Sequence, residues 1–284
     1  MEASPSRTAL MTAVARGRHR MEDQAPLILD DPVALQLVGA RWRDLAARAA
    51  QLPSELDAQI RASMAVRSRY AEDRLARRPF HQYVILGAGL DSFAWRRHGD
   101  SHALMVFEVD HPASQAWKRQ RVEELGLSTG DRHAFAPVDF ETQSLRGGLD
   151  ASGFDGDRPT LFSWLGVTMY LTNDAVESTL RTVAACAPGT EVVMEYAVTD
   201  PLLDDVGREF RGYFAPVSRS VGEAVHSRWS PADVESFVDR CGLRIADHPS
   251  RQDLVSRYFE GRDDGLRPWS VTRLLTAQVP PSGG

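Results

Sequence analysis

The sequence predicts an α/β fold, a doubly wound sheet whose strands run mostly parallel. Residues 83–91 join a short apolar run to a glycine turn and the start of a helix. Further short apolar runs recur along the chain and alternate with stretches of helical pattern. At 284 residues, and with the composition of an ordinary globular protein, the chain can bury a substantial core.

The glycine turn is the centre of the prediction. Residues 83–86, Tyr-Val-Ile-Leu, fit a strand buried on both faces. Gly87 and Gly89 lack a Cβ, so the backbone can turn tightly there and approach a ligand closely. A helix from about Asp91 would direct its free N–H groups toward the same space. Strand, turn and helix together indicate a nucleotide-type site.

The residues after the turn favour one nucleotide over another. A dinucleotide fingerprint needs a third glycine, but Ser92 stands in its place. Asp91 adds a carboxylate that would repel a pyrophosphate. A ligand with an ammonium group, a ribose and no phosphate fits better, and S-adenosylmethionine is such a ligand. The alternative is a turn between strand and helix that binds nothing.

The N-terminal part predicts helices from Thr8 to about Ala50, interrupted at Pro26 and at 30–32. Asp31 before Pro32 indicates an N-cap with proline at the first helical position. A longer helix follows from about Ser54 to Arg77. Residues 1–80 are therefore expected to form a helical cap, and residues 81–279 the main α/β core.

Arg67 is out of place on the long helix. Leu56, Ile60, Met64, Arg67 and Ala71 share one helical face, so the arginine lies in the row that should be buried. A buried arginine needs a carboxylate or several acceptors. Two interpretations follow: an internal salt bridge, or a guanidinium that holds the carboxylate of a bound ligand.

Acidic residues end the next predicted strands. The strand 103–110 ends at Asp110, about 20 residues past the glycines, where nucleotide-binding folds place a ribose-binding carboxylate. A helix is predicted over 113–125, and a strand over 134–138 that ends at Asp139 and Phe140. Such a pair can bind adenine, with the acid accepting from the amino group and the aromatic side chain stacking on the ring. Alternatively, Asp139 is a turn residue and Phe140 belongs to the core.

The remaining elements complete the sheet. Strands are predicted at 160–164, 191–196, 243–246 and 272–279, with helices starting after the caps Thr172 and Ser230. Residues 200–229 show no clean period and are interpreted as an insertion that covers the substrate. The first few residues and 280–284 indicate disordered ends.

Composition excludes several classes. The net charge of −6 gives no reason to expect nucleic acid or an anionic membrane as partner. Cys186 and Cys241 are too few and too far apart for a disulfide framework or a cysteine zinc site. No membrane-spanning run or signal peptide is visible, so a cytoplasmic protein is expected. No zinc or magnesium ligand spacing appears, which favours metal-independent chemistry. The sequence does not predict an oligomeric state.

Several motifs resemble those of one family. "YVILGAGLDSFAWR", "FEVDHP", "PVDF", "PTLFSWLGVTMYLT" and "RYFEGRDDGLRP" occur in the order expected of the leucine carboxyl methyltransferase-like family, especially its bacterial members. The resemblance runs from about Arg16 to Val279. It implies a Rossmann-like, seven-stranded class I methyltransferase sheet with an antiparallel last strand, an N-terminal helical cap and S-adenosylmethionine as cofactor.

The resemblance also implies roles for individual residues. It assigns Arg67 to the cofactor carboxylate and the two glycines, Gly87 and Gly89, to its methionine and ribose portion. Asp110, helped by Glu108, would bind the ribose hydroxyls. Asp139 and Phe140 would hold the adenine.

One departure from the family concerns the substrate. Eukaryotic members that methylate a protein phosphatase carry a glutamate where this chain has Leu165. Its absence argues against a protein C-terminus as acceptor and favours the small-molecule substrates, often natural products, of the bacterial branch.

The acceptor decides whether a base is needed. A carboxylate, with a pKa of about 4, is already ionised at neutral pH, whereas a phenol, with a pKa of about 10, would need a general base. His226 in the presumed cover and Tyr170 are weak candidates for catalysis, and Trp164 and Tyr170 are candidates for lining the acceptor pocket. His111 is interpreted as structural.

The primary hypothesis is therefore an O-methyltransferase that acts on the carboxylate of a small molecule. Methylation of a phenol or hydroxyl on a polyketide-like acceptor is the alternative. Two further hypotheses are an NAD-dependent oxidoreductase, which Ser92 disfavours, and a non-catalytic protein that binds S-adenosylmethionine.

Overall fold

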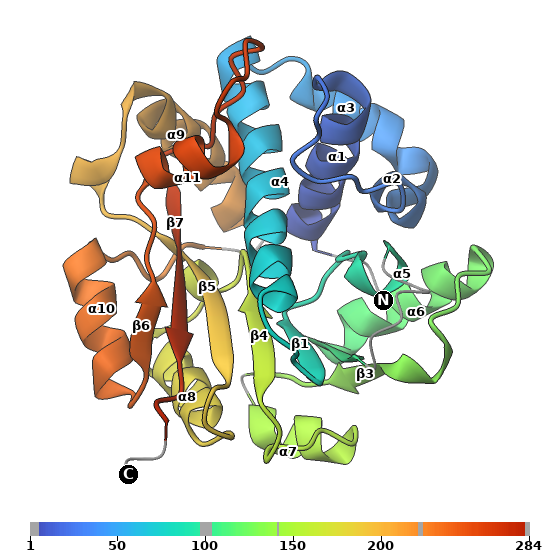
Figure 1. Cartoon of the computed structure of the whole chain (residues 1–284). Helices are drawn as coiled ribbons and strands as arrows, with labels where there is room; N and C mark the ends of the chain where they lie inside the picture. The colour runs from blue at the N-terminus through green and yellow to red at the C-terminus, as the bar shows by residue number, and fades with distance from the viewer. Residues whose placement is uncertain (1–5, 97–103, 141, 221–223, 282–284) are drawn as a thin grey trace.

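The computed structural model describes residues 6–96, 104–140, 142–220 and 224–281. Seven strands form one sheet in the order β3-β2-β1-β4-β5-β7-β6 (Figure 1). Their bounds are β1 Gln82–Leu86, β2 Met105–Asp110, β3 His133–Pro137, β4 Thr160–Trp164, β5 Glu191–Ala197, β6 Arg244–Asp247 and β7 Thr272–Gln278. Strands β1 to β5 pair in parallel, and β7 runs antiparallel to both β5 and β6. The predicted seven-stranded, mostly parallel α/β fold is confirmed.

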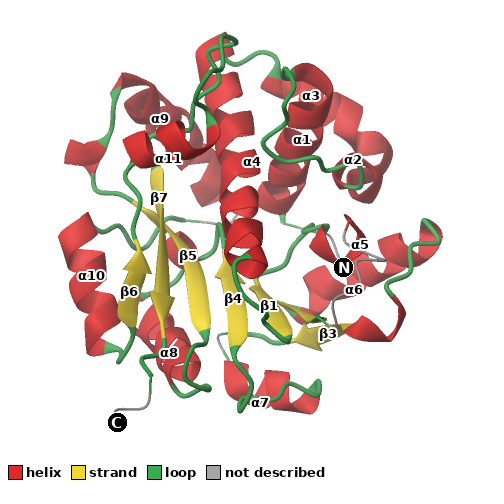
Figure 2. Cartoon of the chain, viewed as in Figure 1, coloured by secondary structure: helices red, strands yellow, loops and turns green. Residues whose placement is uncertain are grey.

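Helices cover both faces of this sheet, as Figure 2 shows. The longer ones are α1 Arg7–Glu22, α4 Ser54–Ala76, α6 Pro112–Glu124, α8 Asn173–Ala184, α9 Asp205–Ser220 and α10 Pro231–Arg240. The shorter ones are α2 Ala34–Val38, α3 Trp42–Ala49, α5 Phe93–Arg96, α7 Leu145–Ala151 and α11 Arg251–Tyr258. Within the described ranges, no helix combines the length and the apolar character that crossing a bilayer requires.

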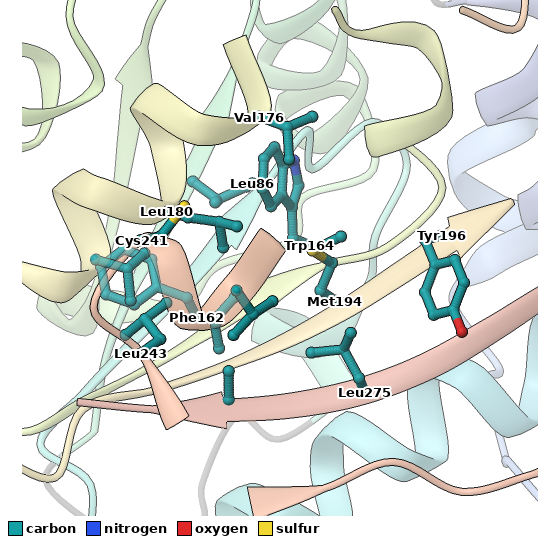
Figure 3. Packing of buried hydrophobic residues seen from close by; sticks show 14 of the residues in the cluster. Leu86, Phe162, Trp164, Val176, Leu180, Met194, Tyr196, Cys241, Leu243 and Leu275 are labelled. Carbon is teal, nitrogen blue, oxygen red and sulfur yellow. The ribbon is translucent and has the colours of Figure 1, made fainter. Parts of the chain in front are cut away.

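The core lies on both faces of the central strands because β1, β4 and β5 are buried along their whole length. On one face, Trp164 packs among Leu86, Val176 and Met194, with α8 closing the cluster (Figure 3). On the other face, Ile85 and other buried side chains pack with residues of α4 and α11. Continuous apolar strands are therefore explained by burial on two sides.

Helix α4 is attached to β5 by a row of ion pairs that burial alone would not predict. Arg67 pairs with Glu195 at 2.8 Å, and Arg74 pairs with Glu191 at 2.7 Å. Between these arginines, the Tyr70 hydroxyl lies 2.8 Å from that of Thr276 on β7. The polar side chains on the inner face of α4 thus meet matching groups on the sheet.

Two local predictions differ from the structure. Asp31 caps backbone N–H groups as expected, but its Oδ1 accepts from Val33 and Ala34, and the helix begins at Ala34 rather than at Pro32. The segment 200–229 contains a sixteen-residue helix, α9, although its pattern predicts no regular element. Val206, Phe210 and Phe214 do recur every four residues, as on one face of a helix, but Pro216 and Gly212 are poor helix formers and argued against this interpretation.

Candidate functional site

Two cavities adjoin each other where α1 and α4 meet the carboxyl ends of the strands. The glycine-turn cavity, of about 300 Å³, is lined by residues that include 86–91, Asp110, Phe140 and Leu165. The α9 cavity, of about 230 Å³, is lined by residues of α4, α9 and the strand ends. Both share one wall, made of Thr8, Thr12, Arg67, Gly166 and Tyr170. Ligands in the two cavities would therefore meet at this shared wall.

The glycine turn has the backbone conformation that the sequence predicts. Gly87 has φ 65° and Gly89 has φ 44°, in the region that favours glycine. A Cβ on Gly87 would lie 2.3 Å from Cγ2 of Val167. The missing side chain therefore makes room for the segment after β4 as well as for a ligand.

Replacement of Gly87 by alanine is expected to lower the free energy of unfolding by about 2–5 kcal/mol. The left-handed backbone costs roughly 1–2 kcal/mol, and the overlap with Val167 adds about 1–3 kcal/mol. Gly126→Ala is the matched control, because Gly126 has φ 63° and open space around it. Urea unfolding should show the smaller loss for the control. Equal losses would mean that the Val167 contact costs nothing.

Asp110 is held against the glycine turn by the backbone. Its Oδ2 accepts the N–H of Gly89 at 2.5 Å, and its Oδ1 accepts the N–H of His111 at 2.7 Å. Burial raises the pKa of Asp110, and these two backbone hydrogen bonds only partly oppose that effect. The carboxylate and the turn are thus fixed relative to each other at the edge of the cavity, as a ribose-binding acid requires.

Arg67 combines both features that its sequence position suggested. Its Nη1 donates to Oε2 of Glu195 at 2.8 Å, and Oε1 of Glu195 accepts the hydroxyl of Thr272 at 2.7 Å. The guanidinium also borders both cavities and lies against Gly166, where a Cβ would approach Nη1 to 2.9 Å. The internal salt bridge is therefore present, and the same arginine faces the space in which a ligand would lie.

Glu108 does not reach the glycine-turn cavity. It is fully buried, and its Oε2 lies 2.5 Å from Nζ of Lys118, itself buried on α6. His133 Nε2 lies 3.5 Å from its Oε1. Glu108 is on the same face of β2 as Asp110 but one pleat deeper, where α6 covers it. The structure does not bring it to the predicted ribose site.

Trp164 and His226 also lie away from the cavities. Side chains alternate along β4, so Ser163 and Leu165 face the glycine-turn cavity while Trp164 points into the core on the opposite face (Figure 3). His226 is exposed, and its backbone N–H donates to the carbonyl of Met169. Its neighbours Val225 and Arg228 line the α9 cavity instead.

Of the remaining predicted residues, some line the glycine-turn cavity and one does not. Phe140 and Tyr170 line the glycine-turn cavity, and Tyr170 belongs to the shared wall. Asp139 is absent from the described lining; its Oδ2 accepts the hydroxyl of Thr142 at 2.9 Å, as in a turn. His111 lines the cavity edge, and its ring Nδ1 accepts the N–H of Ala113 at the start of α6.

Arg16 and Glu195 are site residues that sequence reasoning missed. Arg16 lines the glycine-turn cavity, and it binds Asp31 at 2.9 Å and the carbonyl of Leu90 at 2.7 Å. It lies among buried residues of α1, such as Ala13 and Gly17, which is the same misplaced charge that identified Arg67. Glu195 lines the α9 cavity at the end of β5, where an acid in an apolar strand was a comparable signal.

Metal ligands are not gathered at this site. Among the residues that the structure describes, no group of three or more histidine, cysteine or acidic side chains is arranged to hold a metal ion. Both cysteines are buried and unpaired.

Comparisons with known proteins point to methyltransferases. A family model described as leucine carboxyl methyltransferase matches residues 9–184. A Bacillus subtilis (strain 168) protein, provisionally named the S-adenosyl-L-methionine-dependent methyltransferase YktD, is 29% identical over 298 aligned positions, covering 96% of this chain and 97% of that protein. A Mycobacterium marinum protein with the same provisional activity in its name is 30% identical over 272 positions, covering 91% and 88%.

Solved structures with the same fold are more distant in sequence. A provisionally named methyltransferase from Thermobifida fusca has a TM-score of 0.61 at 17% identity, covering 98% of this chain and 96% of that one. A DUF574 family protein from Streptomyces avermitilis has a TM-score of 0.58 at 17% identity, covering 98% and 99%. At such identity the likeness concerns the fold.

Proposed function

This chain belongs to the leucine carboxyl methyltransferase family, and we propose that it transfers a methyl group to the carboxylate of a small organic acid. The cofactor is S-adenosylmethionine, as it is for the named relatives. The observation that carries the proposal about the acceptor is the charge of the α9 cavity. Its described lining includes Arg7, Arg67, Arg211 and Arg228 but one carboxylate, Glu195, and no histidine.

The residues around the glycine-turn cavity fit the cofactor. Asp110 offers an acceptor for ribose hydroxyls, and Phe140 offers an aromatic face for adenine. The guanidinium of Arg67 is available on the side that Glu195 does not occupy, so it suits the methionine carboxylate. We propose these three roles for this chain. The role of Asp139 in holding adenine stays a proposal too.

For this reaction the protein has only to bind the two reactants, orient them and provide favourable charges. The bound cofactor supplies a methyl group already activated on a sulfonium. A carboxylate acceptor is ionised at neutral pH, so no proton has to be removed. The arginines that line the α9 cavity would attract and orient the acid, while apolar walls such as Met64 and Met169 would exclude water from it. The carboxylate of Glu195, held by Arg67 and Thr272, would keep the guanidinium in place.

A paired panel of acceptors tests this proposal. Purified protein is incubated with S-adenosylmethionine and either aromatic carboxylic acids or phenols of the same skeleton, and products are identified by mass spectrometry. We expect methyl esters, which alkali hydrolyses, and no aryl methyl ethers. Ethers without esters would favour the phenol alternative. Tight cofactor binding with no product from a broad panel would favour a non-catalytic binding protein.

A further inference from the structure

Two arginines of the α9 cavity, Arg211 and Arg228, point to a specific kind of acceptor. We infer that the acid bound in this cavity carries a second carboxylate, held by these two guanidiniums, with an aromatic or alicyclic body between the two acid groups. This inference rests on the proposed methyl transfer to a carboxylate and specifies its substrate class. Both arginines line the α9 cavity but not the glycine-turn cavity, so they lie on the side away from the cofactor.

Arg211 is fixed in position by the chain. Its Nη2 donates to the carbonyl of Val198 at 2.7 Å, just past β5, and its Nη1 pairs with Asp200. The side chain of Arg211 is 17% exposed, whereas that of Asp200 is 79% exposed. Burial lowers the pKa of Arg211; Asp200 opposes this shift, and the neighbouring charge of Arg228 adds to it. The ion pair with an exposed acid therefore leaves this guanidinium under-compensated.

Arg228 brings a second cation to the same place. It forms no ion pair with any residue that the structure describes, although its charge acts on Arg211. Arg7 also lines the cavity and likewise forms no ion pair with a described residue. Arg67 is compensated by buried Glu195, and Arg211 only in part by exposed Asp200, so the charges of Arg7 and Arg228 and part of that of Arg211 remain. Two cations, both on exposed residues, are therefore left without an acidic partner in the described lining of this cavity.

The walls between these charges are apolar and aromatic. Phe210 stacks on Phe214 with ring centroids 4.4 Å apart, and it lies 4.7 Å from the ring of Trp269. Met64 and Met169 complete the lining toward the shared wall. A planar apolar body would fill this space, while each end presents an acid to arginine. A monocarboxylate at the shared wall would leave Arg228 without an acidic partner and Arg211 with exposed Asp200 alone.

The test compares matched acids by calorimetric titration, with S-adenosylhomocysteine present to occupy the cofactor site. The probes are 2-naphthoate against naphthalene-2,6-dicarboxylate, and benzoate against terephthalate. We expect at least one dicarboxylate to bind about tenfold or more tightly than its monocarboxylate partner, and Arg228→Gln to remove most of this preference. Arg244→Gln is the matched control, because Arg244 is exposed on β6, outside both cavities.

Several results of these titrations would overturn the inference of a second carboxylate site. Equal binding within both pairs, a preference that survives Arg228→Gln, or no dicarboxylate binding at millimolar concentration would overturn the inference. Loss of the preference in Arg244→Gln as well would assign it to net charge and overturn it too. Adding S-adenosylmethionine separates the two proposals. Methyl esters of monocarboxylates formed as readily as those of dicarboxylates would keep the function and reject the subsite. Selective dicarboxylate binding without any ester would keep the subsite and reject the function.

Discussion

Replacement of Arg67 by alanine is expected to weaken binding of S-adenosylhomocysteine roughly 30- to 150-fold. Hydrogen bonds between charged groups contribute about 2–3 kcal/mol, and each 1.4 kcal/mol is a factor of ten in affinity. The loss should appear as a higher Kd in a calorimetric titration. Arg69→Ala is the matched control, since Arg69 is on the same helix but more exposed and paired with Asp73.

The ion pair between Arg67 and Glu195 means that Arg67→Ala affects stability as well as affinity, and a second substitution can separate the two effects. Arg67→Ala leaves Glu195, which is 1% exposed, with Thr272 as its hydrogen-bond donor, so the variant is expected to be less stable. The double variant Arg67→Ala/Glu195→Gln removes the unpaired charge and should recover stability without recovering cofactor affinity. Affinity restored by the second substitution, or unchanged by the first, would return Arg67 to a purely structural salt bridge.

Lys118→Met is expected to lower the free energy of unfolding by about 3–5 kcal/mol, because it leaves the buried carboxylate of Glu108 without its cation. Lys118 is the single lysine of the chain, and its ammonium lies 2.5 Å from that carboxylate. Methionine has a similar volume, so the effect reports charge rather than a cavity. Urea unfolding measures it, and Gln120→Ala, on the exposed side of α6, is the control.

The double variant Lys118→Met/Glu108→Gln should recover most of the loss, because no charge is then buried. Acid provides a further readout. Burial alone would raise the pKa of Glu108, but the Lys118 charge and then His133 outweigh it, so the pKa lies below its usual 4.5. A depressed pKa gives stability that is complete above about pH 4.5 and is lost as pH falls toward the folded value. The double variant should lack this part of the acid dependence. A double variant as unstable as Lys118→Met would contradict the buried-pair explanation.

Local sequence was sufficient for most of the fold. The apolar run at 83–86 and those at 160–164 and 191–196 predicted strands because residues buried on both faces leave few polar positions. Ser230 and Thr172 predicted helix starts, and both side chains accept from the third residue of the helix that follows. Helix caps and apolar strand segments are both defined by residues close together in the chain, so the sequence alone predicts them.

The misplaced Arg67 was the most informative single residue for the site. Its position on the buried row of α4 required a partner, and sequence could not say whether that partner was a ligand or another residue. The structure provides Glu195, 128 positions away, and leaves the guanidinium bordering both cavities. Arg16 on α1 gives a weaker signal of the same kind, because its neighbours Ala13 and Gly17 are small and do not mark a clear apolar face.

The sequence by itself determined the strands of a mostly parallel α/β sheet, the glycine turn, the acid Asp110 at a strand end and the need for a partner at Arg67. Only the tertiary structure decided which side of each strand a candidate faces and what lies across from it. Glu108 and Trp164 fall on strands as predicted, but the pleat and the covering helices turn them toward Lys118 and the core. Three residues of the α9 cavity, Arg211, Arg228 and Glu195, come from α9, from the segment after it and from β5. They line one cavity only in the folded chain, so no local pattern in the sequence reveals the group.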